Sequence, residues 1–215
     1  MTLAPTERSD TALDALQQAL LQKTALIHEV DHRVKNNLQL ITSLFQIQAR
    51  RSDPATRDVI CSMLARINAI AVVHRRLFRS EDVERFDVAA FISDLASEIA
   101  SAEAREDVAL HLDLVRIDIA ARNAAPLALV ISELLTNAYR HAFPAGRGGA
   151  IRVLTRTDGP KACIQMTDDG IGMLRDSRSG FGFTIVNMLC RQLGGQLERL
   201  EQSTGTGFVI SLETG

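Results

Sequence analysis

The feature that most constrains the fold is an apolar periodicity of three and four residues that runs through the first 80 residues and breaks once. It predicts two amphipathic helices, over residues 11–50 and 55–79. The break is the segment RRSDP, where Ser52 or Asp53 can cap the second helix and Pro54 suits its first turn. So short a connection makes the helices antiparallel neighbours. The apolar positions are Ile27, Val30, Val34, Leu38, Ile41 and Phe45, then Ile60, Leu64, Ile67, Ala71 and Leu77.

A hairpin with one apolar stripe on each helix leaves part of both stripes in water. The simplest way to bury them is to pair two hairpins in a four-helix bundle. We therefore expect a homodimer that forms through this hairpin.

The pattern changes to alternating apolar residues from about residue 107. A further helix is expected within residues 84–104, and helices over 126–143 and 181–193 interrupt the strands. This order predicts one mixed sheet that is covered on one face by helices. The fold class is α+β: an N-terminal extension over residues 1–20, the helical hairpin over 21–83 and an α/β sandwich over 84–215. Strands are expected over residues 108–114, 117–120, 151–157, 162–168, 194–200 and 207–212.

Composition narrows the classes of function. The 215 residues hold 24 basic and 26 acidic side chains, a net charge of −2, and no Trp, which argues against a dedicated nucleic-acid binder. Three widely spaced cysteines, Cys61, Cys163 and Cys190, fit neither a disulfide framework nor a zinc site. Charged residues interrupt every stretch long enough to span a bilayer. We expect a cytoplasmic protein without a direct membrane span.

A short motif in the first helix raises the question of a metal site. His28, Glu29 and His32 form H-E-x-x-H, in which two histidines one helical turn apart can bind zinc and the Glu can activate water. A motif with three fixed positions arises often by chance, and no third ligand is evident. A zinc metallopeptidase is therefore a minor alternative.

The position of His32 on its helix suggests a different chemistry. Val30 and Val34 lie on the apolar stripe, so the residue midway between them points about 200° away, toward solvent. The cationic and amide donors that follow His32 could stabilise the charge of a phosphoryl group. By itself this pattern also fits a solvated helix face. The donors are Arg33, Lys35, Asn36 and Asn37.

Polar residues recur on the otherwise apolar helix over residues 126–143. Glu133, Asn137, Arg140 and His141 follow three- and four-residue steps and form one polar stripe. Such a stripe is costly against a sheet but favourable if it faces a ligand. These four side chains are candidate ligand-binding residues.

Two glycine-containing segments follow. In TDDGIGM, at the end of a predicted strand, Gly170 and Gly172 permit close backbone approach, and Asp168 or Asp169 can accept a hydrogen bond from an exocyclic amine. The second segment, residues 180–182, opens a helix whose N-terminal amides suit phosphate. Each pair alone is a weak signal, but their order and spacing after the Glu/Asn helix are specific.

These segments together resemble the histidine kinases of two-component signalling, with an ATP-binding domain of the type shared with gyrase, Hsp90 and MutL. DHRVKNNLQLITSLFQIQAR resembles the phosphoacceptor helix of the subfamily related to the HWE kinases, and RINAIAVVHRRLF resembles its second hairpin helix. ISELLTNAYRHAFP is similar to the N box, DDGIG to the G1 box, GFGFTIVNMLCRQLGG to the G2 box, and GTGF to the last signature. The absence of Trp favours the sister subfamily over the true HWE group.

The resemblance implies roles for individual residues. His32 would be the phosphoacceptor, Asn137 the Mg²⁺ ligand and Glu133 the neighbouring acid or base. Asp31 or Glu29 could orient the imidazole, so the general base stays open. The adenine anchor would be Asp168, the nucleotide loop would be shaped by Gly170, Gly172, Gly180 and Gly182, and Thr206 would approach the phosphates.

The expected activity is ATP-dependent autophosphorylation on His32, followed by transfer to an aspartate of a response-regulator receiver domain. The alternatives are a histidine phosphotransfer protein with a degenerate nucleotide domain and a non-catalytic adaptor. The seven residues between Gly172 and Gly180 make a short lid, which a partner would help to close. About 20 residues precede the hairpin, so we expect the signal to come through a sensor partner, a short N-terminal extension or a region beyond this sequence.

Overall fold

The computed structural model describes residues 5–80, 82, 84–173 and 181–213. Its contacts divide the chain into two compact units, Met1–Leu44 and Phe45–Gly215, which are described separately. The predicted α+β class is confirmed, with a helical N-terminal region followed by an α/β domain that contains a mixed sheet. The domain boundaries expected near residues 20 and 83 stay a prediction.

The first two helices meet at the turn that the sequence predicts. Helix α1 spans Pro5–Arg51 and helix α2 spans Pro54–Arg79. Asp53 is the N-cap of α2, where its Oδ1 accepts from the backbone N–H of Thr56 at 3.1 Å. Pro54 occupies the first turn, where its missing N–H costs nothing. Among the described helices, none is both long and apolar enough to cross a membrane.

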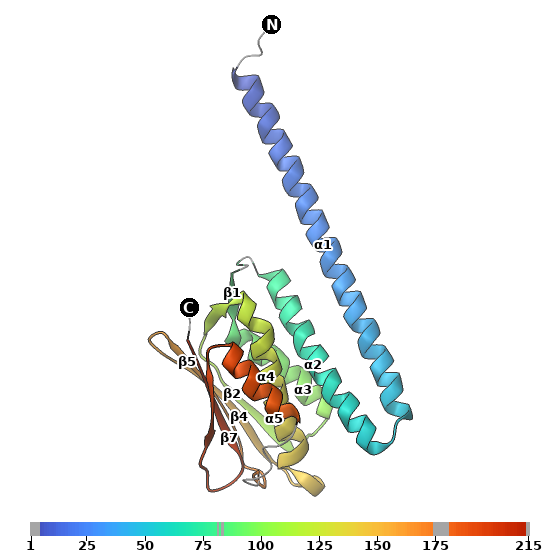
Figure 1. The fold of residues 1–215 in the computed structure, drawn as a ribbon, viewed down its shortest axis with the longest axis vertical. Helices are drawn as coiled ribbons and strands as arrows, with labels where there is room; N and C mark the ends of the chain where they lie inside the picture. The colour runs from blue at the N-terminus through green and yellow to red at the C-terminus, as the bar shows by residue number, and fades with distance from the viewer. Residues whose placement is uncertain (1–4, 81, 83, 174–180, 214–215) are drawn as a thin grey trace. The chain divides into compact units, whose positions relative to one another are not determined.

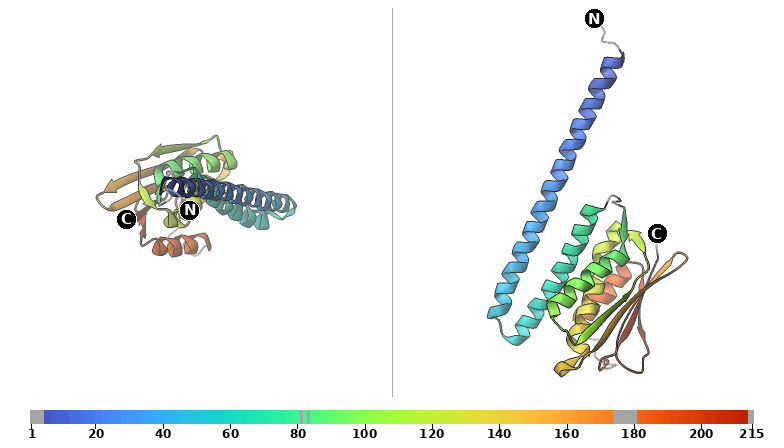
Figure 2. Two further views of the ribbon diagram at one scale, coloured as in Figure 1. Left: turned by 90° about the horizontal axis from the view of Figure 1, so that it is seen from above. Right: turned by 180° about the vertical axis from the view of Figure 1, so that it is seen from behind.

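Helix α2 packs against helices of the C-terminal domain. Its buried residues contact α4 and α3, and Figure 2 shows α2 beside these helices, on the side away from the sheet. The sequence led us to expect that a second copy buries the apolar stripes of both hairpin helices. In the structure, α3 and α4 already cover one face of α2. The buried residues of α2 are Ile60, Ala69, Val72 and Val73.

A five-stranded mixed sheet forms the other layer, in the order β2-β4-β5-β7-β6. β2 and β4 are parallel, and the remaining neighbours are antiparallel. Helices α3, α4 and α5 cover one face of the sheet (Figure 1), and the apolar core lies between the two layers. The strands are β2 (Val108–Asp113), β4 (Gly149–Asp158), β5 (Lys161–Asp168), β6 (Gln196–Leu200) and β7 (Gly207–Glu213). The helices are α3 (Val88–Glu103), α4 (Ala124–Asn137) and α5 (Phe181–Gln192).

One predicted strand lies outside this sheet. β3 (Asp118–Ala120) pairs antiparallel with β1 (Arg85–Asp87), a strand that the sequence pattern did not reveal. The expectation of a single sheet was therefore wrong at this point. The physical reason is that Phe86 and Ile119 are partners in this short ladder and are both buried in the helical core.

The central helix α4 continues past Asn137 into a π-helical segment, η2 (Ala138–Ala142). Short 3₁₀ turns, η1 (Ala121–Asn123) and η3 (Pro144–Gly146), flank the pair. The helix predicted over residues 126–143 is thus confirmed, with an unpredicted change of helical type. A π-helical turn is wider than an α-helical one, so it shifts the side chains that follow around the helix axis.

Candidate functional site

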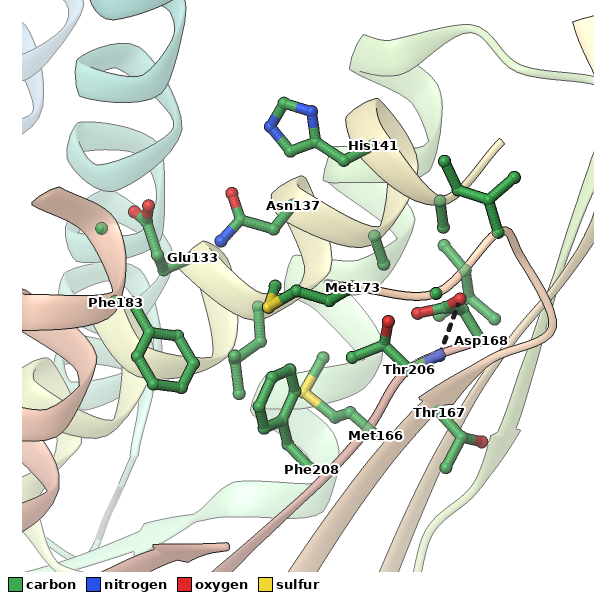
Figure 3. Close-up of a pocket in the computed structure, with 17 residues that line it drawn as sticks. Glu133, Asn137, His141, Met166, Thr167, Asp168, Met173, Phe183, Thr206 and Phe208 are labelled. Atoms are coloured by element: carbon green, nitrogen blue, oxygen red, sulfur yellow. Dashed lines mark hydrogen bonds between the residues drawn. The ribbon is translucent and has the colours of Figure 1, made fainter. Parts of the chain in front are cut away.

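A cavity of about 500 Å³ opens between α4, its π-helical extension and the end of the sheet. Figure 3 shows Glu133, Asn137 and His141 on the helical side and Asp168 and Thr206 on the strand side. The cavity collects seven of the predicted binding residues from four separate segments of the chain. These are Glu133, Asn137, His141, Asp168, Gly172, Gly182 and Thr206.

Asp168 is held rigidly at the strand end of the cavity. Its Oδ1 accepts two backbone hydrogen bonds, from Gly170 N–H at 3.0 Å and from Thr206 N–H at 3.2 Å. Burial raises the pKa of Asp168, while the bonds from Gly170 and Thr206 lower it and the neighbouring Asp169 adds to the rise. Oδ2 accepts no hydrogen bond from any residue that the structure describes. That oxygen is free to accept from a ligand donor.

Two glycines make this arrangement sterically possible. A Cβ on Gly170 would lie 2.2 Å from the carbonyl oxygen of Ala142. Gly205 has a φ of +72°, and a Cβ there would lie 1.8 Å from the carbonyl oxygen of Asp168. Neither position tolerates a side chain. Gly170 therefore holds Asp168 in place through its backbone N–H and does not line the cavity itself.

The helical side presents a different set of groups. The Asn137 amide lines the cavity and makes no hydrogen bond with any described residue, and His141 is exposed at the rim. Arg140 does not line the cavity: its Nε donates to Glu103 at 3.0 Å. Both residues belong to the π-helical segment that follows Asn137, and His141 is the one that lines the cavity.

Glu133 lies deepest on the helical side. Arg66 Nε of α2 donates to Glu133 Oε2 at 2.9 Å, and Arg66 Nη2 lies 2.9 Å from the same oxygen in an ion pair. On its other side, a Cβ on Gly182 would meet Oε1 at 1.8 Å, so only glycine fits there. Arg66 was missed at the sequence level, because no periodicity connects residues that are 67 positions apart.

Apolar side chains form the walls of the cavity. Phe183 and Phe208 lie with ring centroids 5.5 Å apart, and Met166 and Met173 line the same space. Figure 3 places Met173 between the helical side and Asp168. Flat apolar walls beside one fixed carboxylate suit a planar heteroaromatic ring with an exocyclic amine. Met173, Phe183 and Phe208 lie inside the segments TDDGIGM, GFGFTIVNMLCRQLGG and GTGF, but no binding role was predicted for them from the sequence.

Part of the predicted loop cannot be assessed. Gly180 and residues 174–179 of the predicted lid lie outside the described residues. Gly182, in the first turn of α5, does line the cavity.

His32 belongs to the other compact unit and is exposed, as predicted. Glu29 pairs with Arg33, with Glu29 Oε1 and Arg33 Nε 2.7 Å apart, and Asp31 is half-buried. Within the described part of the chain, no three His, Cys, Asp or Glu side chains gather into a possible metal site. The H-E-x-x-H pattern therefore gains no third ligand.

Comparison with protein families matches both halves of the chain. Residues 29–103 match the model described as a histidine kinase. Residues 122–215 match the histidine kinase-, DNA gyrase B- and HSP90-like ATPases, which indicates an ATP-binding site. The chain belongs to the histidine kinase family.

Related histidine kinases align along most of this chain. The sensor histidine kinase PdtaS of Mycobacterium tuberculosis (strain CDC 1551 / Oshkosh) is 32% identical over 218 residues, which cover 97% of this chain and 43% of PdtaS. Blue-light-activated histidine kinase 2 of Erythrobacter litoralis (strain HTCC2594) is 27% identical, over 83% of this chain and 54% of that protein. This histidine kinase chain thus spans about half the length of these relatives, or less.

A solved structure supports the same assignment. The histidine kinase domain of a blue-light activated histidine kinase from Erythrobacter litoralis superimposes with a TM-score of 0.65 at 25% identity. The match covers 87% of this chain and 90% of that domain. The histidine kinase fold therefore extends over both the helical and the α/β regions.

Proposed function

We propose that this chain is the catalytic core of an ATP-dependent protein histidine kinase. It binds ATP in the cavity beside Asp168, autophosphorylates on His32 and passes the phosphoryl group to an aspartate of a response-regulator receiver domain. The observation that carries the proposal is the Asp168 carboxylate in the cavity wall, which two backbone donors fix through Oδ1 while Oδ2 accepts no hydrogen bond from a described residue. The family match to ATPases of this type supports it.

The cavity has two chemically distinct ends. At one end, Asp168 Oδ2 accepts from the exocyclic amine of adenine, and Phe183, Phe208 and Met166 pack on the ring. At the other end, Asn137 and Glu133 approach the phosphates. The Asn137 side-chain amide makes no hydrogen bond with a described residue, and its oxygen is a hard donor that fits a Mg²⁺ ligand; Mg²⁺ would neutralise phosphate charge there.

Phosphoryl transfer moves the γ-phosphoryl group from ATP to a ring nitrogen of His32. The bond from the γ-phosphorus to its bridging oxygen breaks, a phosphorus–nitrogen bond forms, and ADP leaves with the bridging oxygen. The imidazole N–H proton passes to a general base, for which Glu133 in the cavity and Asp31 beside His32 are the candidates. Such transfer depends mainly on positioning and charge stabilisation.

We also propose that the chain acts as a homodimer. Both α1 and α2 expose large apolar side chains at helical spacing, and such stripes favour association. A second copy would cover them in a four-helix bundle. On α1 they include Ile27, Val30, Leu40, Ile41, Leu44 and Ile47, and on α2 they are Val59, Met63, Ile70 and Phe78.

We propose a location in the cytoplasm, because the cysteines are free and the cytoplasm is a reducing compartment. Cys61, Cys163 and Cys190 are free, and burial raises the pKa of Cys190 to about 11, which makes it unreactive. A receiver domain is the expected phosphoryl acceptor, and a sensor partner is the expected source of the signal.

Incubation with γ-labelled ATP and Mg²⁺ tests the proposed function. The kinase should acquire a label that is lost in acid and kept in base, as expected for phosphohistidine, and His32→Gln should prevent labelling. A wild-type protein that binds no ATP, but accepts phosphoryl groups from a phosphorylated receiver, would favour the phosphotransfer alternative. A protein that does neither would favour an adaptor.

A further inference from the structure

We propose that Arg66 of α2 is a positioning residue that holds Glu133 in the orientation of the general base for phosphoryl transfer. This inference rests on the proposed kinase function and deepens it, because it selects Glu133 as the base. It also makes the nucleotide site dependent on the second hairpin helix. The juxtaposition that carries it is the Arg66–Glu133 ion pair in the wall of the nucleotide cavity.

The ion pair is largely shielded from water. The side chains of Arg66 and Glu133 are 18% and 8% exposed. Next to it, the Ser132 hydroxyl donates to the Ala65 carbonyl oxygen at 3.2 Å, so two successive residues of α4 are bonded to two successive residues of α2. This double contact fixes the register of the two helices at the cavity.

The pairing leaves the two carboxylate oxygens of Glu133 in different environments. The oxygen of Glu133 that Arg66 contacts is Oε2. Oε1 lies where Gly182 has no side chain, and Glu133, Asn137, His141 and Gly182 line both the nucleotide cavity and a second cavity of about 760 Å³. Oε1 is therefore an acceptor at the junction of the two spaces. A nucleotide fills the first, and the acceptor imidazole can approach through the second.

Electrostatics explains why the carboxylate needs a cation. A shielded carboxylate beside a triphosphate is repelled by the phosphate charge and, without a cationic partner, would turn away from it. The other charged groups that line the second cavity are Arg57, Asp58, Glu103, Arg105 and Arg140. Among the described residues, Arg140 is bonded to Glu103, Arg105 to Asp107, and Arg57 to backbone carbonyls. Arg66 is the cation in contact with Glu133.

The helix that carries Arg66 adds a functional consequence. Arg66 lies within residues 29–103, the part that matches the histidine kinase model, while Glu133 lies within the matched ATPase, residues 122–215. The base is thus assembled from both parts of the kinase. A movement of α2 relative to α4 would change the orientation of the base without touching the adenine end.

Steady-state autophosphorylation of the full chain tests this inference. Arg66→Met keeps the apolar stem and removes the charge, and it should lower kcat about 10- to 100-fold while the KM for ATP changes less than about 3-fold. Arg66→Lys should restore much of kcat, because an ammonium still pairs with Oε2. Arg76→Met is the matched control: Arg76 is on the same helix and pairs with Asp94 at 2.9 Å in a more exposed position. Its kcat should stay within about 2-fold of wild type.

A double-mutant cycle separates action through Glu133 from direct contact with phosphate. In a Glu133→Gln background, Arg66→Met should lower kcat by less than about 2-fold, since the group that it positions is gone. This neutral pair also avoids an unpaired buried charge, so the comparison remains valid if Arg66→Met alone folds poorly.

Three outcomes overturn the inference. Equal losses from Arg66→Met in both backgrounds would assign Arg66 to the phosphate, and an Arg66→Met kcat equal to that of Arg76→Met would remove any special role. With an active wild type, either result contradicts only this inference. A wild-type chain that acquires no label contradicts the proposed kinase function itself, and this inference with it.

Discussion

The backbone N–H of Thr206 donates to Oδ1 of Asp168 at 3.2 Å, which joins the start of β7 to the end of β5 at the edge of the cavity. The N–H of Gly170 donates to the same oxygen. One oxygen of the carboxylate is thus used to hold the side chain still, and the other accepts no hydrogen bond from a described residue. Because the two oxygens have different roles, a substitution at Asp168 can change ligand binding while the fold is preserved.

Asp168→Asn should abolish adenine recognition while it preserves the fold. The Asn side-chain oxygen can still accept from Gly170 and Thr206, but its NH₂ group then replaces the acceptor that faces the amine of adenine. We expect ADP affinity to fall at least about 100-fold. Calorimetric titration with ADP measures this effect, and a circular dichroism melt confirms that the variant is folded. Unchanged ADP affinity in a folded Asp168→Asn protein would refute the adenine anchor.

The same variant should change the pH dependence of stability in the absence of nucleotide. Because burial raises the pKa of Asp168 above its ordinary 3.8, the folded protein keeps this proton at pH values where the unfolded chain has lost it. Its contribution to the free energy of unfolding is therefore fully present at low pH and is lost as the pH rises through the raised pKa.

Urea unfolding from about pH 4 to about pH 7 measures this sign. The stability of Asp168→Asn relative to wild type should increase with pH and then level off. A relative stability that decreases over this range would mean that the hydrogen bonds to Oδ1 outweigh burial.

Much of the fold could be predicted because its signals are local. The cap formed by Asp53, the periodicity of α4 and the alternation of β4 and β5 each depend on residues a few positions apart. The pairing of Phe86 with Ile119 could not be predicted, since a three-residue strand has almost no alternation and its partner is 33 residues away. The π-helical turn after Asn137 is equally hidden, because it changes the hydrogen bonding and not the apolar pattern.

The candidate site likewise combines residues that local sequence patterns identify with residues that only tertiary contacts bring in. Motif spacing identified Asp168, Asn137 and Glu133, which the fold brings to one cavity. It also included Arg140, which pairs with Glu103, and it omitted Arg66, which reaches the cavity through the packing of α2 on α4. Residues whose role depends on tertiary contacts between distant helices leave no mark in a linear pattern.

The identity of the phosphoacceptor can be tested with two matched histidines. His28 and His32 are both exposed and lie one helical turn apart on α1. His32→Gln should remove the acid-labile label completely, whereas His28→Gln should keep at least about half of it, because the donors that follow His32 remain in place. ADP affinity should be unchanged in both variants. Loss of the label in His28→Gln alone would reassign the phosphoacceptor.

Zinc analysis of the same two variants tests the minor alternative. The purified protein should contain no stoichiometric zinc after treatment with a chelator. Zinc that survives the chelator in wild type, and is lost in His28→Gln, would revive the metallopeptidase hypothesis.

Disruption of the α1 stripe should convert the protein to monomers. Leu38 and Ile41 lie one turn apart on α1, and replacing both with Glu places two charges in the proposed bundle core, where unpaired charges are strongly disfavoured. Multi-angle light scattering should give a dimer for wild type and a monomer for the double variant at micromolar concentration. ADP affinity should persist in the variant, because the nucleotide cavity is built entirely from residues of the Phe45–Gly215 unit. A wild-type monomer would contradict the bundle, and its exposed stripe would then require a different partner.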